Sequence, residues 1–492
     1  MVIIKNSDDY KDESGNYPAV YIDNVSLTEK TETTEPTTEP SSEPEETQKP
    51  EETTNPTNPP EETTEPSLPP IKDNYKSGVL EIGDSFNFGA TASEGYISVE
   101  PTKDYFGGVD ARNLTYEFLG LGEDGYSKTT YRDDAIQMDK DQRIWLENGG
   151  KSGAANAAED NVYAKNDIRS ENYGDKEYDK GDSVVPIRFA VKAAKQSYYK
   201  VKATVGCADT SKPAVVSVFS ERRHPAATDM KIEAGKTATV EFTANVMDVY
   251  FKNDNKSYSD EMLTFMVSGE NAGLASLQIT RIDPNEAPVT IWVCSDSTGC
   301  DQYSYLPFYP LQNYSGVGQY LSKYLTDMTV SNQGEGGLAT SDNAHLNMAQ
   351  EQMRAGDYLY VEYGHNDSAP KDGSMTASEV YKSNLPKYYT AAHDKGAKLI
   401  IVEPIDRCSS AFDSTTGTWT PSLAGIRDAG KAFVEEKIAG GANDIAFVDL
   451  NTAWVNFMNA ETKRIAGVRG DTTYSQNAIH YYYTCSYPKD LL

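Results

Sequence analysis

The sequence predicts a multidomain chain in which an all-β unit precedes an α/β unit. Three observations lead to this prediction. Apolar and polar residues alternate with period two in several short runs between 73 and 284, which is typical of a β-sandwich. From 285 to 492, short apolar runs alternate with helix-like stretches, which indicates a parallel sheet covered by helices on both faces in three layers. The length of 492 residues also exceeds that of a typical single domain.

Residues 29–72 are rich in Thr, Glu and Pro and predict a disordered acidic linker. Twelve Glu and two Lys lie between 29 and 65. Such a segment cannot bury enough apolar surface to offset the entropy of ordering it, and its like charges favour extended conformers. The net charge of the whole chain is −30, which argues against nucleic acid and anionic membranes as partners. No apolar run approaches the ~20 residues that span a bilayer.

The first residues predict a strand that has no partners of its own. Apolar and polar residues alternate from 17 to 27, and the stretch VYIDNVSL resembles the last strand of jelly-roll carbohydrate-binding modules. The resemblance implies that 1–28 is the C-terminal remnant of such a module, so that the true N-terminus, with any signal peptide, is missing. The alternative is a disordered tail with chance alternation.

The β unit is expected to span 73–284. Its period-two runs lie at 79–82, 198–205, 214–219, 237–243 and 277–282, while 120–180 is rich in Gly, Asp and Asn and predicts long surface loops. The stretch from Phe86 to Phe118, which begins FNFG, resembles the galactose-binding-like jelly-roll sandwich that precedes the catalytic domain of rhamnogalacturonan acetylesterase-like proteins. A Gly-Asp-Ser triplet ending at Ser85 opens this unit. Because it begins a β-sandwich strand, we expect it to be a decoy rather than a nucleophile.

Five strands and four helices are predicted for 285–492. The strands are expected at 289–294, 328–331, 358–363, 398–402 and 445–450, and the helices at 318–324, 344–355, 377–395 and 423–438. Asp357 and Gly396 fall in helix-to-strand connections, where turn chemistry favours them.

Three polar turns follow the first three of these strands, and together they carry the groups that serine-based ester hydrolysis needs. Ser297 is the predicted nucleophile, and its own N–H is one oxyanion donor. Gly337 lies in a glycine-rich turn, where a main-chain N–H can approach the substrate as a second donor. The side-chain amide of Asn366 is the third. The chemistry requires no metal and no cofactor.

These turns resemble the first three sequence blocks of the SGNH (GDSL-like) hydrolases. The matching residues are 295–298, 332–337 and 364–367, and the stretches SGVGQYL and YGHND are most similar to the rhamnogalacturonan acetylesterase branch. The resemblance covers roughly 75–492 and implies a three-layer flavodoxin-like fold and an acyl-serine mechanism. Two positions depart from the pattern: Ser295 stands where Gly is commoner, and Leu338 where relatives often carry Arg.

The fourth block of the family supplies the orienting acid and the base as Asp-X-X-His, and here two sites compete. Asp490 fits if the residue after Leu492 is histidine, so that the base lies beyond the given sequence and the domain is truncated. The alternative base is His480, with Asp471 nine residues before it. Truncation predicts little esterase activity for these 492 residues.

The remaining polar residues receive simpler interpretations. Asp296 and Asp367 are expected to stabilise turns, and His365 to have a structural or substrate-contact role. The other histidines, His224, His345 and His393, are expected to be surface or packing residues. The five cysteines, at 207, 294, 300, 408 and 485, show no disulfide framework or zinc spacing and are expected to be buried free thiols.

The resemblance implies a secreted, extracellular carbohydrate esterase. Its expected substrate is the acetylated plant cell-wall polysaccharide rhamnogalacturonan, and further modules are possible beyond both ends. The alternatives are an esterase for another acylated glycan such as acetyl-xylan or for a lipid ester, an inactive carbohydrate-binding protein, and a purely structural surface module.

Overall fold

The computed structural model describes residues 83–88, 94–99, 108–109, 114–118, 151–152, 162–163 and 187–469, the last with gaps at 222–223, 253–254, 261, 270, 302–315, 326, 407–410 and 414. The predicted module remnant at 1–28, the acidic linker and the strand at 79–82 lie outside these residues. Most of the loop region at 120–180 does too. No helix in the described part of the chain is both long and apolar enough to cross a membrane.

Two sheets of mainly antiparallel strands make up the described part of the β unit. One has the order β11-β8-β15-β1-β2, with β5 and β6 beside it, and the other has the order β10-β9-β14-β7-β4-β3. The strands of the first are β1 (Gly83–Asn87), β2 (Ile97–Ser98), β5 (Lys151–Ser152), β6 (Val162–Tyr163), β8 (Ser197–Cys207), β11 (Thr237–Val246) and β15 (Ala272–Arg281). Those of the second are β3 (Gly108–Val109), β4 (Thr115–Phe118), β7 (Ile187–Lys192), β9 (Ala214–Ser220), β10 (His224–Ile232) and β14 (Met262–Ser268).

Alternating apolar side chains from both sheets meet in one hydrophobic core. Phe86 and Val201 enter it from the first sheet, and Phe189 and Phe265 from the second. Phe189 stands edge-on to the ring of Phe86, with ring centroids 5.5 Å apart. The predicted strands at 198–205, 214–219 and 237–243 are confirmed by β8, β9 and β11. That the unit belongs to the galactose-binding-like class stays a prediction.

A five-stranded parallel sheet forms the centre of the second unit. Its strands are β16 (Val289–Ser295), β17 (Met328–Asn332), β18 (Tyr358–Glu362), β19 (Lys398–Val402) and β22 (Ile445–Val448). They lie in the order β17-β16-β18-β19-β22, and every neighbouring pair is parallel. Counted along the chain, this is the 2-1-3-4-5 order of the flavodoxin-like arrangement. The five predicted strands are therefore confirmed.

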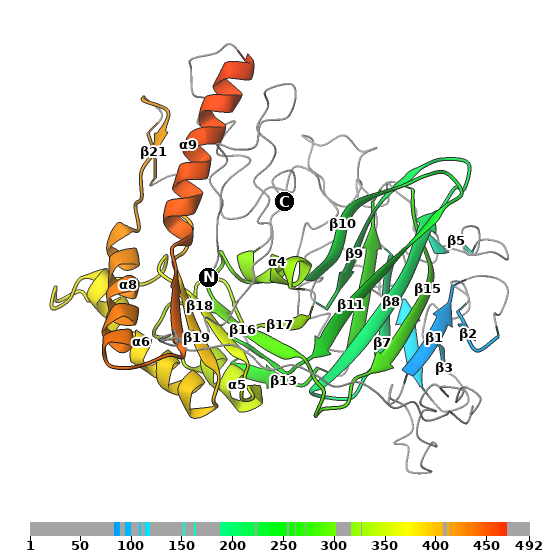
Figure 1. Cartoon of the computed structure of the whole chain (residues 1–492), viewed down its shortest axis with the longest axis horizontal. Coiled ribbons are helices and arrows are strands. Elements are labelled where there is room, and N and C mark those ends of the chain that lie inside the picture. The colour runs from blue at the N-terminus through cyan, green and yellow to red at the C-terminus, as the bar shows by residue number, and fades with distance from the viewer. Residues whose placement is uncertain are drawn as a thin grey trace, which may run out of the picture.

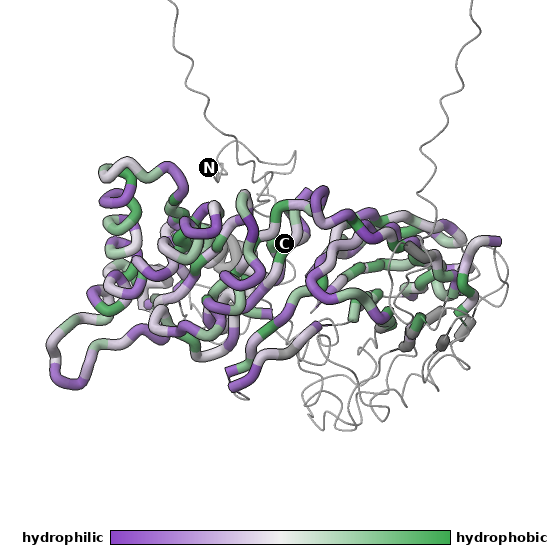
Figure 2. The backbone as a smooth tube through the Cα atoms, turned by 90° about the horizontal axis from the view of Figure 1, so that it is seen from below, coloured by the Kyte–Doolittle hydropathy of each residue, from purple (hydrophilic) through white to green (hydrophobic). Residues whose placement is uncertain are grey.

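Helices cover both faces of this sheet (Figure 1). Core residues of α5 (Ala344–Gln352), α6 (Ala377–Asp394) and α8 (Ala424–Ala439) pack with Trp292 and Leu359 on one face. Residues of α4 (Val317–Tyr324) pack with Val293 on the other. All four predicted helices are confirmed. Hydrophobic and hydrophilic residues alternate along the described chain in both units (Figure 2), as burial of one side of each element requires.

One long helix, α9 (Leu450–Arg469), was not predicted. The fifth strand was expected to reach residue 450, but β22 ends at Val448 and Leu450 is the first residue of α9. Asp449 caps the helix by accepting the Thr452 N–H at 2.9 Å. Trp454 packs edge-on to Trp419 of the short hairpin formed by β20 (Phe412–Asp413) and β21 (Thr418–Trp419).

The two units meet across a shared apolar and polar contact. Tyr198 of β8 belongs to the same core cluster as Trp292, and its hydroxyl lies 3.1 Å from Thr290 Oγ1. The Arg354 guanidinium lies over the Tyr198 ring at 4.7 Å and donates to the Pro288 carbonyl at 2.6 Å. Asp357, in the helix-to-strand connection as predicted, accepts the Trp292 Nε1–H at 3.0 Å.

Candidate active site

The three turns that carry the predicted site lie side by side at the carboxyl edge of the parallel sheet. β16 lies between β17 and β18, so the turn bearing Ser297 lies between the turns that begin after Asn332 and Glu362. In sheets of this order, ligands bind at the point where the strand order reverses, beside the first strand. The chain therefore brings the three turns to the place where such a sheet offers a binding site.

The nucleophile turn is held by its own aspartate. Asp296 Oδ1 accepts the Thr298 N–H at 2.9 Å and the Thr298 hydroxyl at 2.8 Å, which confirms the predicted turn-stabilising role. The residues on either side of Ser297 are buried, whereas Ser297 itself is half-buried. A Cβ on Gly299 would lie 2.1 Å from Ser295 Oγ, so only glycine fits at that close approach. The turn therefore leaves Ser297 partly accessible while the residues on either side of it are buried and fixed.

The turn after β17 is tied directly to the nucleophile turn. The Glu335 N–H donates to the Ser295 carbonyl at 3.1 Å. Asn332 accepts the Gly334 N–H at 2.9 Å and donates from Nδ2 to the Gly299 carbonyl at 2.8 Å. Gly337, the predicted oxyanion donor, has a φ of +78°, a left-handed conformation that favours glycine.

The turn after β18 is connected to the same structure. Asn366 Nδ2 donates to the Leu338 carbonyl at 2.8 Å, and an amide nitrogen carries a second hydrogen that can serve a ligand. Asp367 accepts the Thr340 N–H at 3.2 Å, which confirms its loop-stabilising role. The ring of His365 lies 2.7 Å from the Ile405 carbonyl, a contact that fits the expected structural role.

If Asn366 is the predicted third oxyanion donor, replacing it with alanine is expected to lower kcat for ester hydrolysis by roughly 10²–10³-fold. The same change also removes the bond to the Leu338 carbonyl. The measurement is the rate of acetate release by the folded variant. Asn347→Ala, at an exposed position of α5, is the control and is expected to change little. A kcat for Asn366→Ala within twofold of the wild-type value would remove Asn366 from the site.

The proposed fourth block, with Asp490, Asp471 and His480, lies outside the described residues. The assignment of the base and of its orienting acid therefore stays a prediction. The four other histidines are described. His393, near the end of α6, is mostly exposed and pairs at 2.6 Å with Asp444 in the connection between α8 and β22, as expected of a surface residue.

Two histidines have roles that the sequence analysis missed. His224 is not a surface residue: its ring is buried and lies 3.0 Å from Asp301, which also accepts a hydrogen bond from Asn332 at 2.8 Å. His345 is also more than a packing residue, since it is buried and lies 3.1 Å from the carboxylate of Glu335. Both histidines thus support the turns that carry the predicted site.

Buried carboxyl groups lie at the ends of two strands near these turns. Glu362 ends β18 and accepts the Thr298 hydroxyl at 3.2 Å. Burial, reinforced by the charge of Asp296, raises the pKa of Glu362 well above its usual range. Glu403 follows β19, and burial, reinforced by the charge of Asp449, raises its pKa to about 9. Burial therefore favours the neutral form of both carboxyls.

Among the described residues, no three His, Cys, Asp or Glu side chains are grouped to hold a metal ion. Cys207, Cys294 and Cys300 are buried free thiols, as predicted. Burial raises the pKa of the Cys294 and Cys300 thiols, which keeps both protonated and unreactive.

Comparisons with known proteins agree with this geometry. No known family profile matches the sequence. The chain is 28% identical over 167 residues to a rhamnogalacturonan acetylesterase, RhgT, of Bacillus subtilis, and the match covers 33% of this chain and 65% of that protein. It is 28% identical over 179 residues to YxiM, an uncharacterized esterase of the same species, over 33% of this chain and 44% of that protein. The chain thus spans less than two thirds of the length of either curated relative.

A crystal structure of YxiM is similar at 20% identity with a TM-score of 0.34, over 81% of this chain and 96% of that one. Both curated relatives are named as esterases.

Proposed function

We propose that this chain is a serine-dependent carboxylic ester hydrolase. The observation that carries the proposal is the meeting of the turns of Ser297, Gly337 and Asn366 at the carboxyl edge of one parallel sheet, joined by hydrogen bonds between turns. A lone serine in a turn is common. Here the serine turn is tied to a glycine turn with a left-handed φ, and that glycine turn accepts a hydrogen bond from an asparagine amide, which places the kinds of group that acyl transfer requires at one edge of the sheet.

In the proposed reaction, the Ser297 hydroxyl attacks the acyl carbon while a histidine base takes its proton. The new Oγ–C bond forms a tetrahedral intermediate, whose oxyanion accepts hydrogen bonds from the N–H groups of Ser297 and Gly337 and from the Asn366 amide. The C–O bond to the alcohol then breaks, and the base returns the proton to the leaving oxygen. Water, deprotonated by the same base, then attacks the acyl carbon; the bond between this carbon and Ser297 Oγ breaks, and the base returns the proton to Oγ. The base is His480 or a histidine following Asp490 and Leu492.

We propose acetylated rhamnogalacturonan as the substrate and a secreted, extracellular location. Support comes from the name of one relative, a rhamnogalacturonan acetylesterase, and from the Thr/Glu/Pro-rich segment at 29–72, which is typical of linkers in secreted polysaccharide-degrading enzymes. In this proposal the β unit is a galactose-binding-like sandwich, and 1–28 belongs to a carbohydrate-binding module. The chain's net charge of −30 means that binding an acidic polysaccharide relies on local cations.

The test measures acetate release by the 492-residue protein from acetylated rhamnogalacturonan, acetyl-xylan and a short-chain lipid ester, together with labelling by a serine-reactive phosphonate. We expect labelling at Ser297 and the fastest release from rhamnogalacturonan. Faster acetate release from acetyl-xylan would support the esterase activity and make acetyl-xylan, instead of rhamnogalacturonan, the proposed substrate. Absence of both labelling and release would contradict the proposed activity, unless a version extended beyond Leu492 restores them and thereby identifies the missing base.

A further inference from the structure

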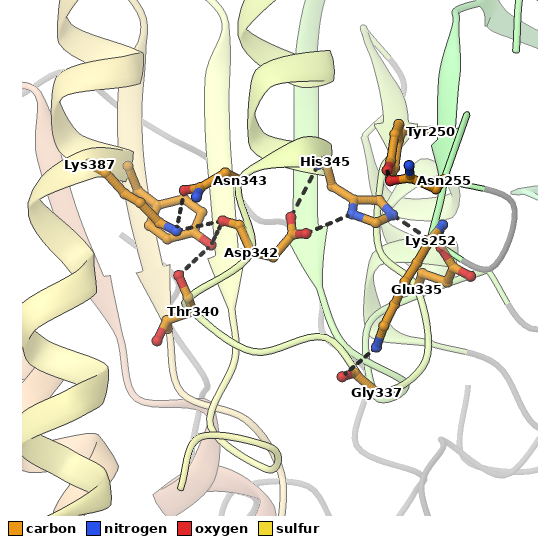
Figure 3. Close-up of polar contacts among 11 residues, drawn as sticks. Tyr250, Lys252, Asn255, Glu335, Gly337, Thr340, Asp342, Asn343, His345 and Lys387 are labelled. Atoms are coloured by element: carbon orange, nitrogen blue, oxygen red, sulfur yellow. Dashed lines mark hydrogen bonds and ion pairs between the residues drawn. The ribbon is translucent and has the colours of Figure 1, made fainter. Parts of the chain in front are cut away.

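The turn that carries Gly337 is held from outside its own unit. β12 (Val249–Phe251) pairs with β13 (Lys256–Tyr258) in a two-stranded sheet, and Lys252 follows β12 directly. The Lys252 main-chain N–H donates to Glu335 Oε2 at 2.7 Å, and its ammonium donates to the Gly337 carbonyl at 3.1 Å. Figure 3 shows this side chain running alongside the turn from Glu335 to Gly337. One residue of the β unit therefore holds the turn at both of these positions.

Glu335 is anchored in turn by a buried histidine. His345, near the start of α5, is 1% exposed and lies 3.1 Å from Glu335 Oε2 on one side and 3.2 Å from Asp342 Oδ1 on the other. Tyr250 of β12 stands edge-on to the ring, with centroids 5.0 Å apart. Burial lowers the pKa of His345, but the carboxylates of Asp342 and Glu335 together raise it by more than burial lowers it. The net change is therefore upward. The ring between two carboxylates holds the Glu335 side chain at the position that receives Lys252 (Figure 3).

Gly337 lies in an open turn, which the Leu338 N–H closes by donating to the Glu335 carbonyl at 3.4 Å. Gly336 and Gly337 are both exposed, and a Cβ on Gly336 would have no neighbour within 4 Å. Two consecutive glycines in the open explore more backbone conformations than any other residue pair, so packing does not fix the direction of the Gly337 N–H. The bond from Lys252 to the Gly337 carbonyl restricts the backbone at the residue whose N–H has to point at the oxyanion. A donor misplaced by about 1 Å costs roughly 10²-fold in rate.

We propose that Lys252 is a positioning residue for the oxyanion site, so that the β unit supplies part of the esterase machinery rather than only a sugar-associated surface. The proposal rests on the proposed function. Lys252 acts through Gly337, and its exposed ammonium adds little to stability. Its removal should therefore lower catalysis while leaving the fold intact.

The experiment compares Lys252→Met, Lys252→Arg and the control Lys231→Met, which alters an exposed lysine on β10 of the same unit. Lys252→Met keeps the main-chain bond to Glu335 and much of the aliphatic stem but loses the ammonium. We expect kcat for acetate release to fall about 10-fold, KM to stay within twofold, and Tm to be unchanged. Lys252→Arg should recover part of the loss, and Lys231→Met should match the wild type. The rate of phosphonate labelling at Ser297 provides the same comparison where turnover is slow.

Three outcomes distinguish the positioning role of Lys252 from the proposed esterase function. An unchanged kcat and labelling rate in Lys252→Met, with Ser297→Ala inactive, would overturn the positioning role and keep the esterase. A change in KM alone would also overturn it, because it would make Lys252 a substrate contact. Activity that survives in Ser297→Ala would instead overturn the proposed function itself.

Discussion

Ser297→Ala is expected to abolish ester hydrolysis, with a loss of about 10⁴-fold or more in kcat. The hydroxyl that forms the acyl-enzyme is removed, and what remains is the catalysis that oxyanion donors and substrate binding provide alone. Ser297 is half-buried in a turn whose bonds are made by Asp296 and Thr298, so the change should not disturb the fold. The measurement is acetate release by matched amounts of folded protein.

The chain contains its own control for this experiment. Ser85, like Ser297, follows an aspartate, but it lies within β1, where its backbone pairs with Gln278 of the antiparallel strand β15. Ser85→Ala is expected to leave activity unchanged. If Ser85→Ala abolished activity and Ser297→Ala did not, the nucleophile would lie in the β unit, and the site proposed around Ser297 would be wrong.

Glu403→Gln is expected to stabilise the folded protein at neutral pH. The carboxyl is fully buried, and neither oxygen has a hydrogen-bond partner among the described residues. Its pKa is raised to about 9 in the folded state, against about 4.3 in an unfolded chain. Between these two values folding takes up a proton, so stability falls as the pH rises. Because pH 7 lies about 2.7 units above the unfolded pKa, ionisable Glu403 lowers the free energy of unfolding by roughly 4 kcal/mol at that pH.

Glutamine has a similar shape and never ionises, so the variant should escape this dependence. We expect its free energy of unfolding to exceed that of the wild type by about 2–4 kcal/mol at pH 7 and to converge with it near pH 4. Denaturant unfolding at several pH values measures the difference. Glu435→Gln, exposed on α8, is the control and is expected to leave the pH dependence unchanged. Equal slopes for Glu403→Gln and the wild type would show that Glu403 ionises freely in the fold.

The parallel sheet could be predicted because its signal is local. Each strand is an apolar run of about five residues between turn residues, as at Tyr358–Glu362, and the polar turns that follow define the site once the strands are parallel. The helix α9 was missed because its first residue, Leu450, was assigned to the preceding strand although Asp449 ends the apolar run. Its apolar residues Trp454 and Met458 pack mainly on a small cluster around Trp419. Asp449, three residues before Thr452, was the available start signal.

The supports of the site could not be predicted, because they join positions that are distant in sequence. His224 meets Asp301 across 77 residues, and Lys252 meets Gly337 across 85. No periodicity or motif links such pairs, and a lone histidine in a β unit is more often a packing residue than a support. These contacts depend on how two units dock, which is decided by the whole fold.

The docking of Tyr198 has a consequence for how this chain can be divided. The change of sequence pattern near 284 separates the β unit from the α/β unit. Tyr198 and Met247 of the β unit nevertheless belong to the apolar cluster around Trp292 of the α/β unit. A fragment beginning at 285 would expose that face to water and would be prone to aggregate. Expressing the second unit alone is therefore a poor route to a minimal enzyme. The two units should be expressed and engineered together.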